Sequence, residues 1–271
     1  MKICYSTNGF KNHSLDSSFE IISALGFQGV EVAITTEHFP NLDLLNQAEN
    51  LVKASKKHNI PITNLHAGEP FLLSKTAHYP SIITENKNER NKRIQFIKEV
   101  MELGNEIGCR NITITSGLLE STSNKENAWH ILLESINRTI ELLYPNMQLL
   151  IEQEPEMFVA TTEDLSKLMF DSQHRLKINL DIGHLQVNGE NISNSLKVLK
   201  DDLVNIHFED IKNQIHQHLL PGQGEINFVP FFSTLKTIGY QGNLTADLYP
   251  FSHMAQEAAT ITRNFLKKFE L

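Results

Sequence analysis

The chain has 271 residues, close to the roughly 250 that one (β/α)8 barrel requires. A hydrophobic content of 40% predicts a large core, and no apolar run approaches the length of a membrane span. The formal net charge of -8 would repel a polyanion, so nucleic acid is a disfavoured partner.

Two cysteines are too few for a disulfide framework, so we expect Cys4 and Cys109 to be buried reduced thiols of a cytoplasmic protein. The N-terminal stretch MKICYSTNGF lacks the extended apolar segment of a signal peptide and predicts a first strand. The chain also contains 12 histidines, several of which follow apolar strand-like stretches.

Strand and helix patterns alternate eight times along the chain, which predicts a parallel sheet with crossover helices. We predict strands at 2–6, 29–34, 62–66, 111–115, 148–152, 176–181, 203–208 and 243–248. We predict helices from Ser14 or Asp16 to 25, then at 42–58, 86–107, 125–143, 162–170, 192–199, 229–238 and 252–269. Eight such units close most naturally into a (β/α)8 TIM barrel, which we expect to form a single domain over residues 1–271.

The predicted strands end in residues that bind metals or transfer protons. In a barrel these ends converge on one mouth. The residues are His66, Ser116, Glu152, Asp181, His207 and Asp247. We therefore expect the functional site at the carboxyl ends of the strands.

Four of these residues, Glu152, Asp181, His207 and Asp247, offer three oxygens and one nitrogen. Such a set suits Mn, Co or Mg, and zinc is compatible but less favoured. His184 lies three residues after Asp181 and could hold a second cation or a substrate hydroxyl. The alternatives are that Glu152 is satisfied by backbone groups, that Asp181 caps a helix or turn, and that His184 is an exposed loop residue.

His216 and His218 are separated by one residue, so on an extended segment both rings would point to one side. Together with His184 they are candidate additional metal ligands. A solvated loop is the alternative for His216. Glu154 and Glu156 follow Glu152 and are expected in a loop or at the rim of the site.

Several fragments resemble the xylose isomerase-like TIM-barrel superfamily, in particular its sugar phosphate isomerase/epimerase branch, which is related to nucleases of the endonuclease IV type. The fragments are LGFQGVEV from Leu25, IEQEP from Ile151, LDIGH from Leu180, HFED from His207, HLLPGQGEINF from His218 and ADLYPF from Ala246. The resemblance implies that Glu152, Asp181, His207 and Asp247 are metal ligands. It also implies that Glu152 and Asp247 form the acid-base pair. Asp247 departs from the family pattern, where glutamate is usual, and this puts two-base epimerisation in doubt.

We therefore expect a cytoplasmic, metal-dependent isomerase or epimerase. Its substrate would be a polyol or keto-sugar, a sugar phosphate or a cyclitol, and a proton would be transferred next to a carbonyl group. His184 would contact substrate oxygens, and His66, His218 and Glu31 would line the pocket. Glu31 could equally be a structural partner at the end of its strand.

Two other functions stay open. An endonuclease IV-like zinc phosphodiesterase would use His66, Glu152, Asp181, His184, His207 and His218, but Ser116 stands where that pattern has histidine, and His216 where it has aspartate. A non-catalytic accessory protein that binds a metal or a polyol is the third possibility. The sequence leaves the oligomeric state open, a homo-oligomer included.

Overall fold

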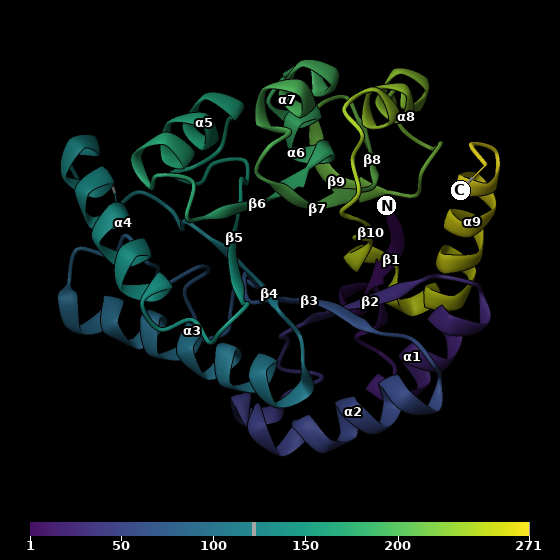
Figure 1. Cartoon of the computed structure of the whole chain (residues 1–271), viewed down its shortest axis with the longest axis horizontal. Coiled ribbons are helices and arrows are strands. Elements are labelled where there is room, and N and C mark those ends of the chain that lie inside the picture. Colours follow the sequence, from purple (N-terminus) through teal and green to yellow (C-terminus); the bar gives the residue numbers. More distant parts are fainter. Residues whose placement is uncertain (121–122, 271) are drawn as a thin grey trace.

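The computed structural model describes residues 1–120 and 123–270, and its eight parallel strands form a closed barrel. The order around the barrel is β1-β10-β7-β6-β5-β4-β3-β2. The strands are β1 Lys2–Ser6, β2 Gly29–Ala33, β3 Ile62–His66, β4 Asn111–Thr115, β5 Gln148–Glu152, β6 Lys177–Asp181, β7 Leu203–Phe208 and β10 Asn243–Ala246. Figure 1 shows β1 beside β10, where the barrel closes. The predicted (β/α)8 fold is confirmed.

Helices surround the strands as an outer ring (Figure 1). They are α1 Leu15–Ala24, α2 Ala48–Lys57, α3 Lys87–Ile107, α4 Lys125–Ile140, α5 Thr162–Asp171, α6 Ile182–Val187, α7 Ile192–Leu199, α8 Phe228–Thr237 and α9 Ala255–Lys267. Short 3-10 helices are η1 Thr7–Phe10, η2 Pro40–Leu42, η3 Leu45–Gln47 and η4 Tyr249–Met254. None of the helices in the described residues is both long and apolar enough to cross a membrane.

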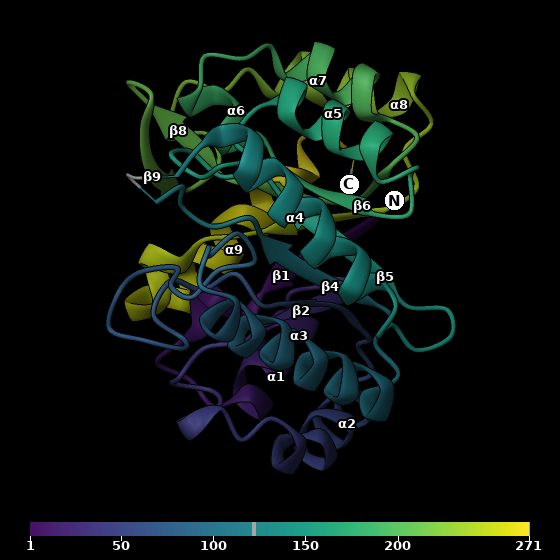
Figure 2. The ribbon, with the colours of Figure 1, turned by 90° about the vertical axis from the view of Figure 1, so that its left-hand side faces the viewer.

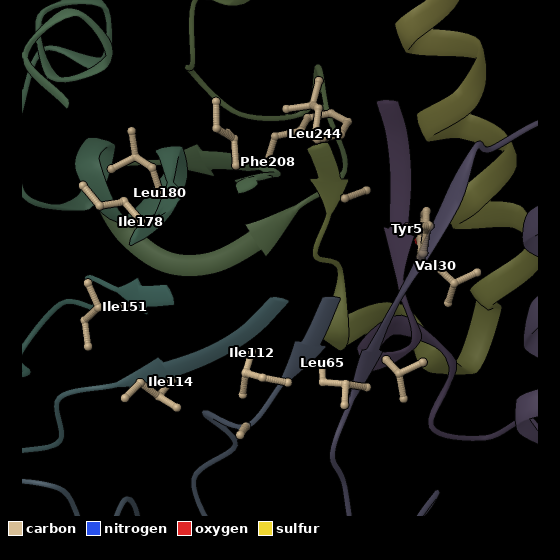
Figure 3. Packing of buried hydrophobic residues seen from close by; sticks show 14 of the residues in the cluster. Tyr5, Val30, Leu65, Ile112, Ile114, Ile151, Ile178, Leu180, Phe208 and Leu244 are labelled. Atoms are coloured by element: carbon tan, nitrogen blue, oxygen red, sulfur yellow. The ribbon is translucent and has the colours of Figure 1, made fainter. Parts of the chain in front are cut away.

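The hydrophobic core lies between the strands and the helices. In β4, Ile112 and Ile114 belong to this core, whereas Thr113 lies between them in the chain and faces the barrel interior. The same alternation recurs in β6, where Ile178 and Leu180 are core residues. Figure 3 shows these apolar side chains around the ring of strands. The apolar residues on the outward face of each strand thus pack against the helices, and the inward face carries polar residues.

The barrel interior is polar. Glu31 on β2 is 1% exposed and accepts hydrogen bonds from Asn64 Nδ2 at 2.7 Å and Asn205 Nδ2 at 3.1 Å. Thr113 and Thr245 in turn hydrogen-bond these two asparagines. Many barrels fill this space with branched apolar side chains. Here hydrogen-bonded polar side chains occupy it, and their hydrogen bonds fix the orientation of the side chains at the mouth.

Several predicted boundaries were wrong for local reasons. The helix predicted at 42–58 is limited to α2, because Asn41 and Leu42 have φ values of 57° and 54° that a regular helix does not allow. The last helix begins at Ala255, after η4 with its Pro250. The helix α6 was missed altogether, because its six residues are too few for a clear periodicity.

The segment after β7 was predicted as an extended loop and forms an antiparallel hairpin of β8 Asp210–Lys212 and β9 Ile215–Leu219. The hairpin projects from one end of the barrel (Figure 2). Asn213 and Gln214 at its tip have φ values of 55° and 54°, as a tight hairpin turn requires. His216 and His218 lie on β9.

Cys4 and Cys109 are free and buried, as predicted. Burial raises the pKa of each thiol to about 12, so both thiols are unreactive.

One buried carboxylate anchors the hairpin and the loop that follows it. Asp210 accepts hydrogen bonds from the backbone N–H groups of Ile211, Gly222, Gly224 and Ile226 at 2.9 to 3.0 Å. A Cβ on Gly224 would lie 2.3 Å from Asp210 Oδ1, so glycine is needed for this close approach. Asp210 therefore holds the segment that carries His216 and His218.

We expect Asp210→Ala to lower the free energy of unfolding by about 3 kcal/mol, because four backbone donors, two of them in buried hydrogen bonds, lose their shared acceptor. Urea denaturation of the metal-free protein measures this loss. Asp201→Ala is the matched control, since Asp201 has an 80% exposed side chain and should change stability by less than about 0.5 kcal/mol. Equal effects of the two substitutions would contradict the anchoring role.

Candidate active site

A cavity of about 390 Å³ opens at the carboxyl ends of the barrel strands. It is of a size that binds small molecules. Its lining includes His66, Glu152, His184, His216, His218 and Asp247. Asp181 and His207 are buried next to these residues and do not line the cavity.

A chain of short contacts runs across the barrel through His207. Its Nδ1 lies 2.7 Å from Glu152 Oε1, and its Nε2 lies 2.9 Å from Glu31 Oε2. The other oxygen of Glu152, Oε2, lies 2.6 Å from His66 Nε2. Strands β2, β3, β5 and β7 are thus linked through two carboxylates and two imidazoles.

These contacts determine the charges of the residues. Burial opposes ionisation of Glu152, but His207 and His66 outweigh it and hold the pKa of Glu152 well below 4.5. Burial likewise opposes a charge on His66, yet Glu152 raises the pKa of His66 to about 9. The pKa of His207 is also raised, because Glu31 and Glu152 outweigh its burial.

Asp181 caps the N-terminus of α6, where its Oδ1 accepts the N–H of His184 at 2.9 Å. Its Oδ2 is buried and has no hydrogen-bond partner. Gln153 fixes the backbone of Asp181 on both sides, since its side-chain amide bonds both the carbonyl and the N–H group of Asp181. The helix-cap reading of Asp181 is therefore correct, and it leaves one carboxylate oxygen available.

Asp247 follows β10 directly, at the edge of the cavity. Its Oδ1 accepts a hydrogen bond from Asn8 Nδ2 at 3.2 Å, and its backbone carbonyl lies 2.9 Å from His218 Nδ1. In the barrel, β10 is separated from β5 by β7 and β6. Asp247 and Glu152 therefore reach the cavity from well-separated strands.

Three histidines meet on one side of the cavity. The Nε2 atoms of His184 and His216 are 3.0 Å apart, and those of His216 and His218 are 2.8 Å apart. His184 Nδ1 and His218 Nδ1 each face a backbone carbonyl, which can only accept, so both Nδ1 atoms carry the proton. Their Nε2 atoms both face Nε2 of His216. Burial and the two neighbouring histidines lower the pKa of His216 to about 3.

The predicted site residues come together, except that Glu31 lies deeper than expected. It does not line the cavity and instead supports His207 from within the barrel. His216 is partly buried and not a solvated loop residue, and His184 is 4% exposed. Glu154, predicted in a loop or at the rim of the site, lines the cavity. Burial and the charge of Glu152 raise the pKa of Glu154 to about 8.

Sequence reasoning did not select Glu209 or Gln153 for the site. Glu209 is fully buried, and burial together with the charge of Asp181 raises the pKa of Glu209 well above its usual value. The available signal was its position directly after the strand predicted at 203–208, where side chains gather at the mouth of a barrel. No comparable signal exists for Gln153, whose side chain turns to the neighbouring strand β6.

The donor set fits a divalent cation. Ligand atoms of Asp181, His207 and Asp247 lie within 4.8 Å of one another, as do those of Glu152, Asp181 and His184. His207 Nε2 is held by Glu31, so Nδ1 is the nitrogen that faces Glu152 and Asp181. The unpartnered Oδ2 of Asp181 is a further donor. The three histidines form a separate set of nitrogen donors, of the kind that suits zinc.

The chain belongs to the xylose isomerase-like TIM barrel family, whose model matches residues 19–268. An uncharacterized protein of Methanocaldococcus jannaschii, MJ1614, is 28% identical over 207 residues, which cover 73% of this chain and 81% of that protein. An inosose dehydratase of Clostridium perfringens is 26% identical over 164 residues, which cover 53% of this chain and 55% of that protein.

Solved structures share the fold across nearly the whole chain. A structure of the IolI protein with a bound zinc atom has a TM-score of 0.83 at 20% identity, and covers 99% of this chain and 97% of its own. The 3-keto-D-glucoside 4-epimerase YcjR of E. coli has a TM-score of 0.80 at 19% identity, and covers 100% of this chain and 99% of its own. At these identities the likeness shows the fold alone.

The His66–Glu152 contact predicts a pH-dependent stability. The pKa of His66 is raised from 6.5 to about 9 in the folded chain, so its stabilising contribution is complete below about pH 6.5 and is lost as the pH rises through about 9. We expect the melting temperature of the chelator-treated protein to fall over this range, and to fall less in His66→Gln. His130→Gln, at an exposed position, should behave like the wild type. Parallel curves for wild type and His66→Gln would contradict the prediction.

Proposed function

We propose that the protein is a divalent-metal-dependent enzyme that transfers a proton at the carbon next to the carbonyl group of a sugar or cyclitol. One observation carries this proposal: Glu152 and Asp247 reach the same cavity from separate strands, with Asp181 and His207 buried beside them. Similarity to epimerases of the same fold is compatible with it.

Glu152, Asp181, His207 and Asp247 are the proposed metal ligands. A bound divalent cation would act as a Lewis acid and lower the cost of negative charge on the substrate carbonyl oxygen. The oxygen-rich set favours Mn, Co or Mg over zinc.

Glu152 is the proposed base. It is ionised at neutral pH because His207 and His66 lower its pKa, so it can accept a proton from the carbon next to the carbonyl. Asp247 is the proposed acid that returns a proton to this carbon from another direction. Asn8 holds the Asp247 carboxylate, which limits the freedom of this shorter side chain. His184 would bind a substrate hydroxyl or carbonyl oxygen.

The charge of the cavity favours an uncharged substrate. Among the described residues, its lining contains five carboxyl groups, one lysine and no arginine, and the pKa of one of these carboxyl groups, Glu154, is raised to about 8. His66 also lines the cavity, with a pKa raised to about 9, but it is paired with Glu152 at 2.6 Å. The lysine, Lys11, is paired with Glu69 at 2.9 Å. His78 adds no positive charge at neutral pH, because its burial and the charge of Arg93 lower its pKa to about 4. A phosphate or carboxylate group would therefore be repelled, and we infer an unphosphorylated keto-sugar or cyclitol as the substrate class.

Dehydration of a cyclitol is the second candidate, and the similarity to inosose dehydratases favours it. Its first step is the same proton abstraction by Glu152. The hydroxyl group on the carbon β to the carbonyl then takes a proton from the proposed acid, Asp247, and leaves as water while a C=C bond forms, so the product is lighter by one water molecule. Mass spectrometry of the product separates dehydration from epimerisation.

The first test is metal content. We expect elemental analysis of the purified protein to find about one equivalent of Mn, Co or Mg, because the proposed ligands form one oxygen-rich set. About three equivalents of zinc would instead support the phosphodiesterase, and no metal would support a non-catalytic accessory protein.

The second test is exchange of the substrate C–H group with heavy water, with uncharged ketohexoses and inososes as probes. We expect Glu152→Gln to slow the exchange by about 10³-fold, because the base is lost. Asp247→Asn should retain exchange but form less epimer, because the returning acid is lost.

Glu156→Gln is the control for this test, since Glu156 is exposed and does not line the cavity. The metal content of each variant is measured alongside, so that loss of metal is not mistaken for loss of the base. Wild-type exchange rates in metal-loaded Glu152→Gln would refute the assignment of the base.

A further inference from the structure

Glu209 is a fully buried carboxylate without a hydrogen-bond partner. It directly follows β7, which ends at Phe208, and its side chain reaches the backbone of α6 at Gly183. Both of its carboxylate oxygens are buried, and neither finds a partner among the described residues. A buried charged group in this condition is costly unless something compensates it.

The carboxylate of Glu209 lies beside that of Asp181. Ligand atoms of Asp181, Glu209 and His218 are all within 4.8 Å of one another. Asp181 Oδ2 is likewise buried and unpartnered. One carboxylate oxygen of Asp181 and one of Glu209 are therefore close enough to share a cation.

The backbone of α6 leaves room for this arrangement. A Cβ on Gly183 would lie 1.7 Å from Glu209 Oε1, so any other residue at this position would displace the carboxylate. Gly183 directly precedes His184 and belongs to the turn that Asp181 caps. Glycine at this position thus permits Glu209 to approach Asp181.

Among the described residues, histidines accompany Asp181 but not Glu209. In the ion pairs found among residues 1–120 and 123–270, Asp181 meets only His184 at 3.7 Å and His207 at 3.9 Å, and no pair includes Glu209. His207 is already shared between Glu31 and Glu152. A cation bound from solution could pair with the buried oxygens of Asp181 and Glu209.

We propose that Glu209 is a fifth ligand of the metal centre, acting together with Asp181. The inference rests on the proposed function, because it takes the centre formed by Glu152, Asp181, His207 and Asp247 as given. Glu209 raises the number of carboxylate ligands to four beside one imidazole. A set of this composition favours hard cations such as Mn²⁺ and Mg²⁺ over Zn²⁺.

The test compares Mn²⁺ binding by chelator-treated wild type, Glu209→Gln and Gly183→Ala, using isothermal titration calorimetry. We expect the dissociation constant for Mn²⁺ to rise at least about tenfold in Glu209→Gln, and the preference for Mn²⁺ over Zn²⁺ to fall. The melting temperature of metal-free Glu209→Gln should not decrease, because one of two neighbouring buried carboxylates is removed. Gly183→Ala keeps the carboxylate but displaces it, and should weaken Mn²⁺ binding as well.

Glu225→Gln is the matched control, because Glu225 is an exposed carboxylate in the loop that follows the same hairpin. It should bind Mn²⁺ like the wild type. Unchanged Mn²⁺ affinity in Glu209→Gln would overturn the inference and leave Glu209 as a neutral acid that donates a hydrogen bond to Asp181. Absence of divalent-cation binding by the wild type would refute the proposed function itself, so the two failures are distinguishable.

Discussion

The contacts of His207 with Glu31 and Glu152 are the interaction on which the rest of the site depends. Both ring nitrogens face carboxylates, at 2.9 Å and 2.7 Å, and His207 and Glu31 are each only 1% exposed. The asparagines that surround Glu31 keep this lower carboxylate in place. His207 in turn holds Glu152 ionised and oriented toward the cavity. The polar residues inside the barrel therefore fix the charge and the position of a side chain at its mouth.

This organisation separates two tasks along each strand. Outward residues such as Ile151 and Phe208 pack against the helices and provide the hydrophobic stabilisation, while Glu152 and His207, one position away, face the interior. Stability and chemistry therefore depend on different faces of the same strands. The interior network is costly to assemble, since its charges are desolvated, and is maintained by mutual pairing.

The sequence was sufficient to predict the eight-stranded barrel, because its apolar runs have strand length and alternate with helical periodicity. It also identified the strand ends that converge, since this follows from the topology alone. Depth along the barrel axis was not predictable: Glu31 lies below the cavity because its neighbours on β3 and β7 provide amide donors there. The hairpin was missed because its turn, Asn213–Gln214, lacks the glycine that usually marks such turns.

Asp210 connects the hairpin to the barrel through backbone N–H groups, and these groups are the same for every amino acid other than proline. Side chains on β9 can consequently vary without loss of this attachment. His216 and His218 are presented by β9, whereas Glu152 and Asp181 are presented by barrel strands. The side chains of the hairpin can therefore change over generations of sequence while the carboxylates on the barrel strands keep their positions.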